Sequence, residues 1–335
     1  MNKKSLVSAI AIGLALTAGS TFADTSSKRI ALSNNYAGNS WRQAMLQSWD
    51  KVTSKAVADG VVAEAPAFTT AENQVTEQAA QIQNLILQGY DAIVINAASP
   101  EGLNGAVKQA CDAGIVVVSF DGIVTEPCAY RIAVDFAQMG AIQVDYVASR
   151  IKSGNLLEIR GLAGVFVDDE IHAGIQQGVN KHSQFNIVGS VHGDWAQAVA
   201  QKAVAGILPS LPKVDAVVTQ GGDGYGAAQA FKAAGRPTPL IVMGNRYDEL
   251  AWWKEQKDAN GYETMSVSIA PGVSTLGFWV AQMILDGKKV PQDLTVPFLQ
   301  ISQSDLEKRL ATTQPGGVAN VEYSLKDAKR AVKGK

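Results

Sequence analysis

Two short apolar runs flank a helical pattern near residue 100. Residues 92–95 (AIVI) and 115–120 (IVVVSF) are β-branched and apolar almost throughout, which is typical of parallel strands buried on both faces. Between them, residues 103–111 place small and apolar side chains at helical spacing. The pattern predicts one βαβ unit at this point of the chain.

A polar residue follows each of the two predicted strands. Asn96 comes directly after the first run and Asp121 directly after the second. The carboxyl ends of neighbouring parallel strands meet at one edge of the sheet, which is where ligands bind in open α/β folds. We therefore expect Asn96 and Asp121 to belong to a binding site.

The same alternation of strand and helix patterns continues along the chain. In the first series we expect further strands at 29–33, 61–67 and 130–134 and helices containing 41–52 and 72–87. A second series has helices at 138–152, 168–179, 194–208 and 224–234 and strands at 156–159, 187–191, 216–219 and 240–243. A third piece has strands at 265–269 and 294–298 around a helix that follows Pro271.

Two successive series of this kind predict an α/β fold with two lobes, each a doubly wound parallel sheet. We expect residues 24–134 plus 270–297 to form the N-terminal lobe. Residues 135–269 plus 298–335 are expected to form the C-terminal lobe and tail. Lobes that share several short connections bend as a hinge.

The first 23 residues have the pattern of a signal peptide. A basic start at Lys3 and Lys4 precedes an apolar run at 6–18 and a small-x-small signal at 21–23. We expect cleavage after Ala23 and export. The formal net charge of −2 and the lack of a basic run argue against nucleic acid as a partner.

The chain has two cysteines, Cys111 and Cys128. The expected topology places both at the amino-terminal edge of the first sheet, so we expect a Cys111–Cys128 disulfide in an exported protein. Two free buried thiols are the alternative.

A glycine-rich run at 220–226 follows an expected strand and opens a helix, as a dinucleotide fingerprint does. Its G-x-G-x-G spacing is wrong, and Asn245 follows the next strand where an NAD site needs Asp or Glu. We interpret the run as a tight turn that carries polar groups into a cleft.

The sequence offers little support for catalysis or metal binding. The three histidines share no metal-ligand spacing with one another or with a cysteine, and no G-x-S-x-G elbow is present. The acids at 168–170 fit the start of a helix, and a ligand contact from Asp169 is the alternative. We expect no enzyme activity, no cofactor and no metal.

Trp41 and Trp195 each stand after a strand-end loop, in different expected lobes. Packing in a core is the usual role of a tryptophan. The alternative is that both rings face a shared cleft. Flat rings beside amides and carboxylates suit a pyranose or a polyol, because its C–H faces contact rings while its hydroxyls meet fixed polar groups.

The ordered set of these segments resembles the periplasmic solute-binding proteins of the ribose type, which feed ABC importers. The resemblance covers nearly the whole chain after residue 23 and rests on RIALS, GYDAIVINAASPEGL, AGIVVVSFD and RGLAG. It implies the type I periplasmic binding protein fold, with three crossovers here near Asp135, Ile269 and Pro297, closing on ligand like a clamshell.

The resemblance also implies a ligand set. It assigns hydroxyl contacts to Asn39, Asn96, Asp121 and Asn245, stacking to Trp41 and Trp195, charge-assisted bonds to Arg42 and Asp169, and a strand-end contact to Gln220 or Asp223. Arg42 replaces a second ring of the family, and Gly122 and Asp169 stand where ribose binders have arginine. These departures argue against ribose and leave pentose, hexose, polyol and a signal molecule open.

We therefore expect the substrate-binding component of an ABC importer, located in the periplasm and monomeric. It would capture a small sugar or polyol and deliver it to the membrane permease. The alternatives are a receptor for an autoinducer-2-like signal, a chemoreceptor-linked binding protein, the sugar-sensing core of a repressor, and an enzyme on the same scaffold.

Overall fold

The βαβ unit predicted near residue 100 forms the centre of the first of two sheets in the computed structural model, which describes residues 24–71 and 74–334. β3 (Ala92–Asn96) and β4 (Val116–Phe120) pair in parallel, and α3 (Asn104–Asp112) connects them. All five residues of β3 are buried. The expected signal peptide and the expected helix start at Glu72 lie outside the described residues.

The N-terminal sheet has six parallel strands in the order β11-β5-β4-β3-β1-β2. Its other strands are β1 (Ile30–Asn34), β2 (Ala67–Thr69), β5 (Tyr130–Ala133) and β11 (Asp293–Thr295). Helices α1 (Ser40–Ala58) and α9 (Val273–Leu285) cover one face, and α2 (Val75–Leu87) and α3 cover the other. This order is that of a doubly wound fold.

Residues 61–67, predicted as a strand, form a regular strand only from Ala67 onward. An isolated bridge joins Arg29 and Glu64, and Leu32 N–H donates to the Pro66 carbonyl oxygen. Proline has no N–H to donate, so the ladder between β1 and β2 is established after Pro66.

The C-terminal sheet has four parallel strands in the order β7-β6-β8-β9. They are β6 (Gly154–Arg160), β7 (Phe185–His192), β8 (Ala216–Val218) and β9 (Leu240–Ile241). Helices α4 (Phe136–Arg150) and α5 (Phe166–Lys181) contact each other, as do α6 (Gln197–Ile207) and α7 (Gly224–Ala233). A short 3-10 turn (Leu208–Ser210) follows α6, and α8 (Tyr247–Asn260), which the sequence analysis did not anticipate, follows β9.

The close approach of α4 and α5 depends on glycine. A Cβ atom at Gly174 would lie 1.8 Å from the carbonyl oxygen of Ala137, and one at Gly140 would lie 2.2 Å from that of Ile171. The backbones of the two helices therefore touch, which fixes the position of their amino-terminal ends.

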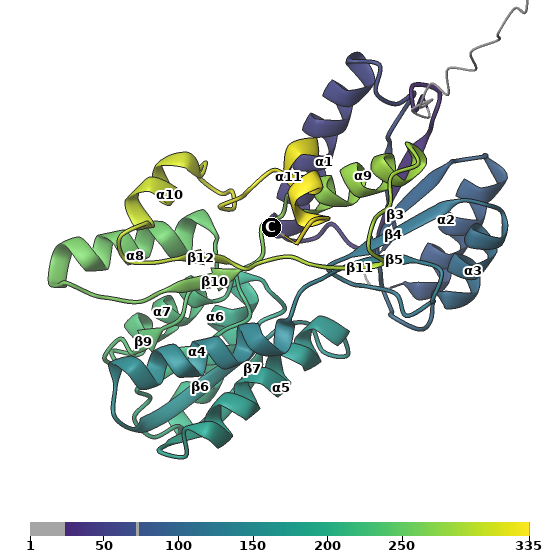
Figure 1. The fold of residues 1–335 in the computed structure, drawn as a ribbon. Helices are drawn as coiled ribbons and strands as arrows, with labels where there is room; N and C mark the ends of the chain where they lie inside the picture. The colour runs from purple at the N-terminus through teal and green to yellow at the C-terminus, as the bar shows by residue number, and fades with distance from the viewer. Residues whose placement is uncertain (1–23, 72–73, 335) are drawn as a thin grey trace, which may run out of the picture.

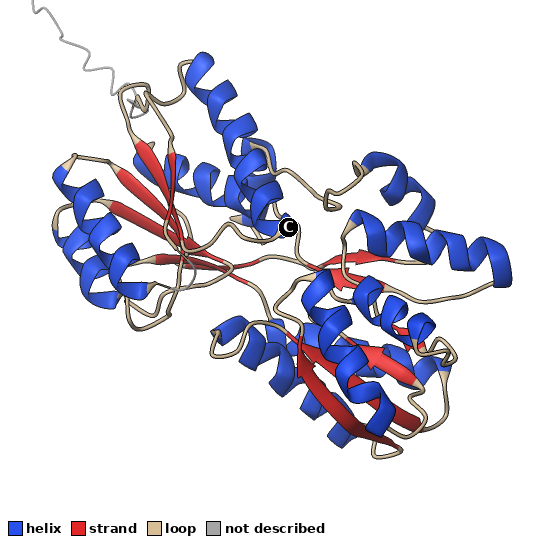
Figure 2. Ribbon diagram, turned by 180° about the vertical axis from the view of Figure 1, so that it is seen from behind, coloured by secondary structure: helices blue, strands red, loops and turns tan. Residues whose placement is uncertain are grey.

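The two lobes are joined at the three expected places. The chain crosses between β5 and α4, between β10 (Ser266–Ser268) and α9, and between β11 and β12 (Leu299–Ile301). β10 and β12 pair antiparallel beside the C-terminal sheet. The two lobes are visible in both ribbon views (Figures 1 and 2).

The tail crosses back once more, so the expected placement of all of 298–335 with the C-terminal lobe does not hold. α10 (Leu306–Thr312) contacts α8, whereas α11 (Leu325–Ala331) contacts α9 of the N-terminal lobe. Trp279 of α9 donates its indole N–H to the Tyr323 carbonyl oxygen at 3.1 Å. The tail thus forms a fourth connection between the lobes.

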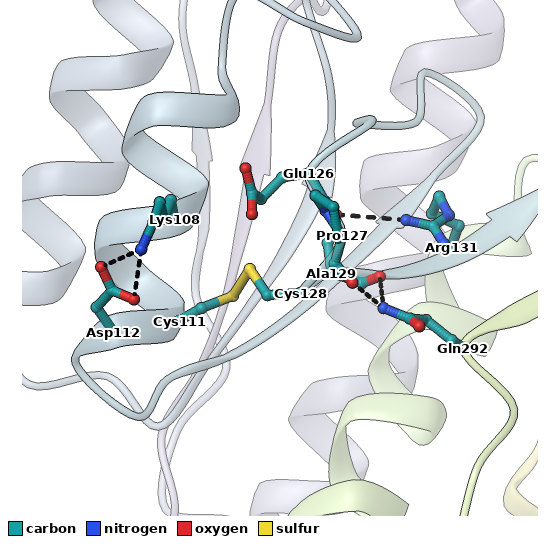
Figure 3. The surroundings of a disulfide bond; sticks show 9 residues. All are labelled: Lys108, Cys111, Asp112, Glu126, Pro127, Cys128, Ala129, Arg131 and Gln292. Atoms are coloured by element: carbon teal, nitrogen blue, oxygen red, sulfur yellow. Dashed lines mark hydrogen bonds and ion pairs between the residues drawn. A yellow bond between two sulfur atoms is a disulfide. The ribbon is translucent and has the colours of Figure 1, made fainter.

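The predicted disulfide between Cys111 and Cys128 is confirmed (Figure 3). Cys111 lies at the end of α3, and Cys128 lies in the loop before β5, with 6.4 Å between the two Cα atoms. The side-chain amide of Gln292 donates to the carbonyl oxygens on either side of Cys128, at Pro127 and Ala129. Among the described helices, none is both long and apolar enough to cross a membrane.

Candidate functional site

A cavity lies between the two lobes and encloses about 520 Å³, part of which is open to solvent. The N-terminal lobe, the C-terminal lobe and the hinge all contribute side chains to its lining. They are Asn39, Trp41, Arg42 and Asp121 from the first, Phe136, Met139, Val165, Val167, Ile171, Trp195, Gln220, Gly221 and Arg246 from the second, and Ser268 and Ile269 from the hinge. Side chains of both lobes and of the hinge therefore face one shared cavity.

The N-terminal wall is built on a buried ion pair. Arg42 Nη2 lies 3.1 Å from Asp121 Oδ2, and the two side chains are 13 % and 8 % exposed. Burial raises the pKa of the Asp121 carboxyl, and the charge of Arg42 opposes that rise. Burial likewise lowers the pKa of the Arg42 guanidinium. The pair holds both charges in a place where neither would be stable alone.

Asn96 positions Asp121 from behind the wall. Its Nδ2 donates to Asp121 Oδ2 at 2.9 Å, and its Oδ1 accepts from Gly122 N–H at 3.3 Å. Asn96 is fully buried and does not line the cavity. Asp121 itself has φ of 58°, a left-handed conformation that is uncommon outside glycine and clusters at functional sites.

The first turn of α1 carries three lining residues. Asn39 caps the helix by accepting from Arg42 N–H at 2.8 Å. Trp41 is 7 % exposed and donates its indole N–H to the Ile269 carbonyl oxygen at 2.9 Å. The Arg42 guanidinium lies 5.2 Å from the centre of the Trp41 ring, within the range of a cation–π contact.

Trp195 forms part of the opposite wall. Asp194 and Trp195 both have positive φ, at 54° and 53°, so the turn before α6 holds two strained residues in succession. A Cβ atom at Gly161 would lie 2.2 Å from Cε2 of the Trp195 ring. The missing side chain at Gly161 is what allows the ring to lie in this place.

Gln220 lines the cavity beside a buried acid, Asp168. Gln220 Nε2 donates to Asp168 Oδ1 at 2.8 Å, and Arg160 forms an ion pair with Asp168 Oδ2 at 2.7 Å. The Oε1 atom of Gln220 is buried and has no hydrogen-bond partner among the described residues. The same is true of Arg42 Nη1. Buried polar atoms normally have partners, so a bound molecule with donors and acceptors would satisfy both.

Asp169 does not reach the cavity. Its side chain is 66 % exposed and forms an ion pair with Arg160 Nη2 at 2.8 Å. The predicted ligand contact from Asp169 is therefore not supported by its position, because Arg160 holds its carboxylate on the outside of α5.

Asn245 and Asp223 lie behind the C-terminal wall. Asn245 Nδ2 donates to the carbonyl oxygens of Ile269 at 3.3 Å and Ala319 at 3.0 Å, so it ties β9 to the hinge and the tail. Asp223 is fully buried, and neither of its carboxylate oxygens has a partner among the described residues. Burial and the nearby Glu249 raise its pKa well above the ordinary value.

Arg246 is a lining residue that the sequence analysis missed. It stands between the end of β9 and the start of α8, and its Nη1 donates to Asn245 Oδ1 at 3.3 Å. Glu249 accepts the backbone N–H of Arg246 at 3.0 Å and caps the helix. The R-x-x-E pattern at 246–249, directly after the expected strand at 240–243, could have indicated the start of this helix and so the position of Arg246.

The cavity thus brings together six of the predicted residues: Asn39, Trp41, Arg42, Asp121, Trp195 and Gln220. Their contact with a ligand stays a prediction. Within the described part of the chain, no group of three or more His, Cys, Asp and Glu side chains could hold a metal ion. Charged, amide and aromatic groups on facing walls can bind hydroxyls and stack on C–H faces.

Comparison with known proteins agrees with this architecture. Residues 30–289 match the family model of the periplasmic binding protein domain. The ribose import binding protein RbsB of Salmonella typhimurium is 27% identical over 310 residues, which cover 90% of this chain and 100% of that protein. A xylitol-binding protein of Mycolicibacterium smegmatis is 28% identical over 307 residues, covering 88% of this chain and 84% of that protein.

Among solved structures, an ABC transporter solute binding protein from Thermobispora bispora superposes with a TM-score of 0.86 at 35% identity. The superposition covers 92% of this chain and 95% of that one. From the two-lobed fold, the cavity between the lobes and these matches, the chain belongs to the periplasmic binding protein family.

Proposed function

We propose that this chain is the substrate-binding component of an ABC importer and that it captures a small sugar or polyol between its lobes. The observation that carries the proposal is the placement of Trp41 and Trp195 on facing walls around the Arg42–Asp121 pair. Relatives named for ribose and xylitol binding support the same substrate class.

The polar atoms of the cavity suit hydroxyl groups. A hydroxyl donates one hydrogen bond and accepts others, so it can donate to Asp121 and accept from Arg42. Arg42 Nη1 and Gln220 Oε1, which find no hydrogen-bond partner in the described part of the chain, are a donor and an acceptor on different lobes. A molecule with several hydroxyls would satisfy both at once.

Ligand binding would favour the closed arrangement of the lobes. A ligand shifts an open–closed equilibrium only by its difference in affinity for the two states. Here the ligand contacts of both walls are complete only when Arg42 and Asp121 face Gln220, Arg246 and Trp195. The membrane permease would then recognise the closed form.

The proposal is tested by isothermal titration calorimetry and thermal shift against a panel of pentoses, hexoses and polyols. Tight binding of one class, with an unfolding temperature that rises with ligand concentration, is the expected result. Tight binding of an amino acid or a metal ion, with no response to any carbohydrate or polyol, would contradict it.

Export and the permease partner are further parts of the proposal. We infer cleavage after Ala23 and a periplasmic location, which N-terminal sequencing of the secreted chain checks. Delivery to a permease is checked by substrate uptake in cells that lack or carry this protein. Uptake that does not depend on the protein would contradict delivery while leaving ligand binding in place.

A further inference from the structure

One side of the cavity is apolar. Five apolar lining side chains come from the start of α4, from the residue before α5 and from the first turns of α5: Phe136, Met139, Val165, Val167 and Ile171. Among the described residues, α4 and α5 contribute no polar side chain to the lining. We call these five side chains the α4–α5 wall.

The polar residues of the same two segments are engaged elsewhere. Asp135 accepts Gln138 N–H at 2.8 Å and caps α4. Asp168 is fully buried between Arg160 and Gln220, and Asp169 is held outside by Arg160. The carboxylates that could have served a hydroxyl at this wall are therefore turned away from it.

The remaining polar lining groups lie on other elements. Asn39, Arg42 and Asp121 come from the N-terminal lobe, Gln220 and Arg246 from the ends of β8 and β9, and Ser268 from the hinge. The polar lining groups thus come from elements other than α4 and α5, and the lining side chains of α4 and α5 are all apolar. A ligand that fits both sets of side chains has hydroxyls on one side and an apolar edge on the other.

We infer that the ligand is a deoxy sugar or a deoxy polyol whose methyl or methylene group faces the α4–α5 wall. This inference rests on the proposed function and narrows its substrate class. A hydroxyl at that edge would lose its water and find no partner among the five side chains. Adding one hydroxyl against an apolar wall weakens binding by up to roughly 100-fold.

Matched sugar pairs that differ by one hydroxyl test the inference by calorimetry on the purified protein. The pairs are D-fucose and D-galactose, L-fucose and L-galactose, L-rhamnose and L-mannose, and 2-deoxy-D-ribose and D-ribose. We expect the deoxy member of the pair that binds best to bind at least about tenfold more tightly than its parent.

The outcomes separate the two proposals. If parent sugars bind as tightly as their deoxy partners, or more tightly, the inference is overturned and the proposed function stands. If none of these sugars and no polyol binds, both are overturned.

A second measurement tests whether the α4–α5 wall causes the preference for the deoxy sugar. Val167→Thr keeps the side-chain volume and adds a hydroxyl, so it gives the parent sugar a partner. We expect the deoxy-to-parent affinity ratio to fall several-fold. Val199→Thr on α6, where the valine is 40% exposed and does not line the cavity, is the matched control.

An unchanged ratio in Val167→Thr would overturn the assignment to the α4–α5 wall. Met139→Gln changes the same wall on α4 and provides the same readout if Val167→Thr does not fold. For it too, a fall in the ratio supports the inference and an unchanged ratio overturns it.

Discussion

Trp41 and Asn245 donate hydrogen bonds to the same acceptor, the carbonyl oxygen of Ile269, at 2.9 and 3.3 Å. Trp41 belongs to α1 of the N-terminal lobe, and Asn245 follows β9 of the C-terminal lobe. One hinge carbonyl is therefore held from both lobes, beside a cavity that Trp41 also lines.

Two substitutions of Trp41 separate its roles. Trp41→Phe keeps a ring in the cavity and removes the N–H to Ile269, so we expect a stability loss of about 1 kcal/mol and an affinity within about tenfold of the original. Trp41→Ala also removes the stacking face and should weaken binding further. Urea unfolding and calorimetry measure the two effects, and equal affinities for both variants would contradict the stacking role.

Gly161→Ala should disturb the position of Trp195 without touching the ligand. The added methyl would lie 2.2 Å from the ring, so the ring must move and we expect affinity to fall by roughly tenfold or more. Gly206→Ala on α6 is the matched control, because nothing lies within 4 Å of its added Cβ. That variant should bind normally and be slightly more stable, since alanine suits a helix better than glycine.

Asp121→Asn tests the buried ion pair as a ligand site. The amide keeps the shape but loses the charge, so charge-assisted bonds to hydroxyls are lost and affinity should fall roughly 10- to 100-fold. Circular dichroism shows whether the fold is retained. Asp293→Asn removes the ion pair between Asp293 and Arg131 on the same lobe, where Asp293 is 67% exposed, and should leave affinity unchanged.

Asp223 predicts a pH dependence of stability. Burial raises the pKa of the Asp223 carboxyl well above the ordinary value of 3.8. At a pH between 3.8 and the raised pKa, the folded state holds a proton that the unfolded state has lost. This group therefore lowers stability as pH rises. We expect Asp223→Asn to stabilise the protein at neutral pH and to lose that advantage near pH 4.

Asp145→Asn is the control, and its effect on stability is expected to have the opposite sign. Ion pairing with Lys181 lowers the pKa of Asp145, so Asp145→Asn should reduce stability at neutral pH, and the reduction should fade as pH falls. Urea unfolding at several pH values measures both variants. A stabilisation by Asp223→Asn that does not change with pH would contradict the assignment.

The disulfide should make a measurable contribution to stability. It joins residues separated by 17 positions, and closing a loop of that size is worth about 3 kcal/mol in the chain-entropy description. The double variant Cys111→Ser with Cys128→Ser should lose about this amount in urea unfolding. Reductant should destabilise the original protein and have no effect on the double variant.

Much of the architecture could be predicted because buried parallel strands have an unmistakable pattern. Residues 92–95 and 115–120 are apolar on both faces, and the structure buries β3 completely. The carboxyl-end position of Asp121 follows from the topology alone. The β2 boundary could not be predicted in this way, since residues 61–67 (VVAEAPA) are mostly apolar but mix Glu64 and Pro66 into the run.

The orientation of polar side chains was harder to predict than their position. Asn96 and Asn245 stand at strand ends as expected, yet one supports Asp121 and the other holds the hinge. Asp169 turns outward because Arg160, nine positions earlier on β6, pairs with it. Such outcomes depend on tertiary neighbours, which a single sequence does not reveal. Arg246 was missed because the helix it begins had not been anticipated.

The returning tail has a practical consequence for measuring closure. Gln282 of α9 donates to Thr25 near the start of the described chain, and α11 near its end contacts α9, so both ends are anchored to the N-terminal lobe. Fluorophores fused at the two ends would keep a constant separation throughout the cycle. A sensor needs one dye on the other lobe, for instance at the exposed Lys202 of α6, where energy transfer to an end would follow the motion.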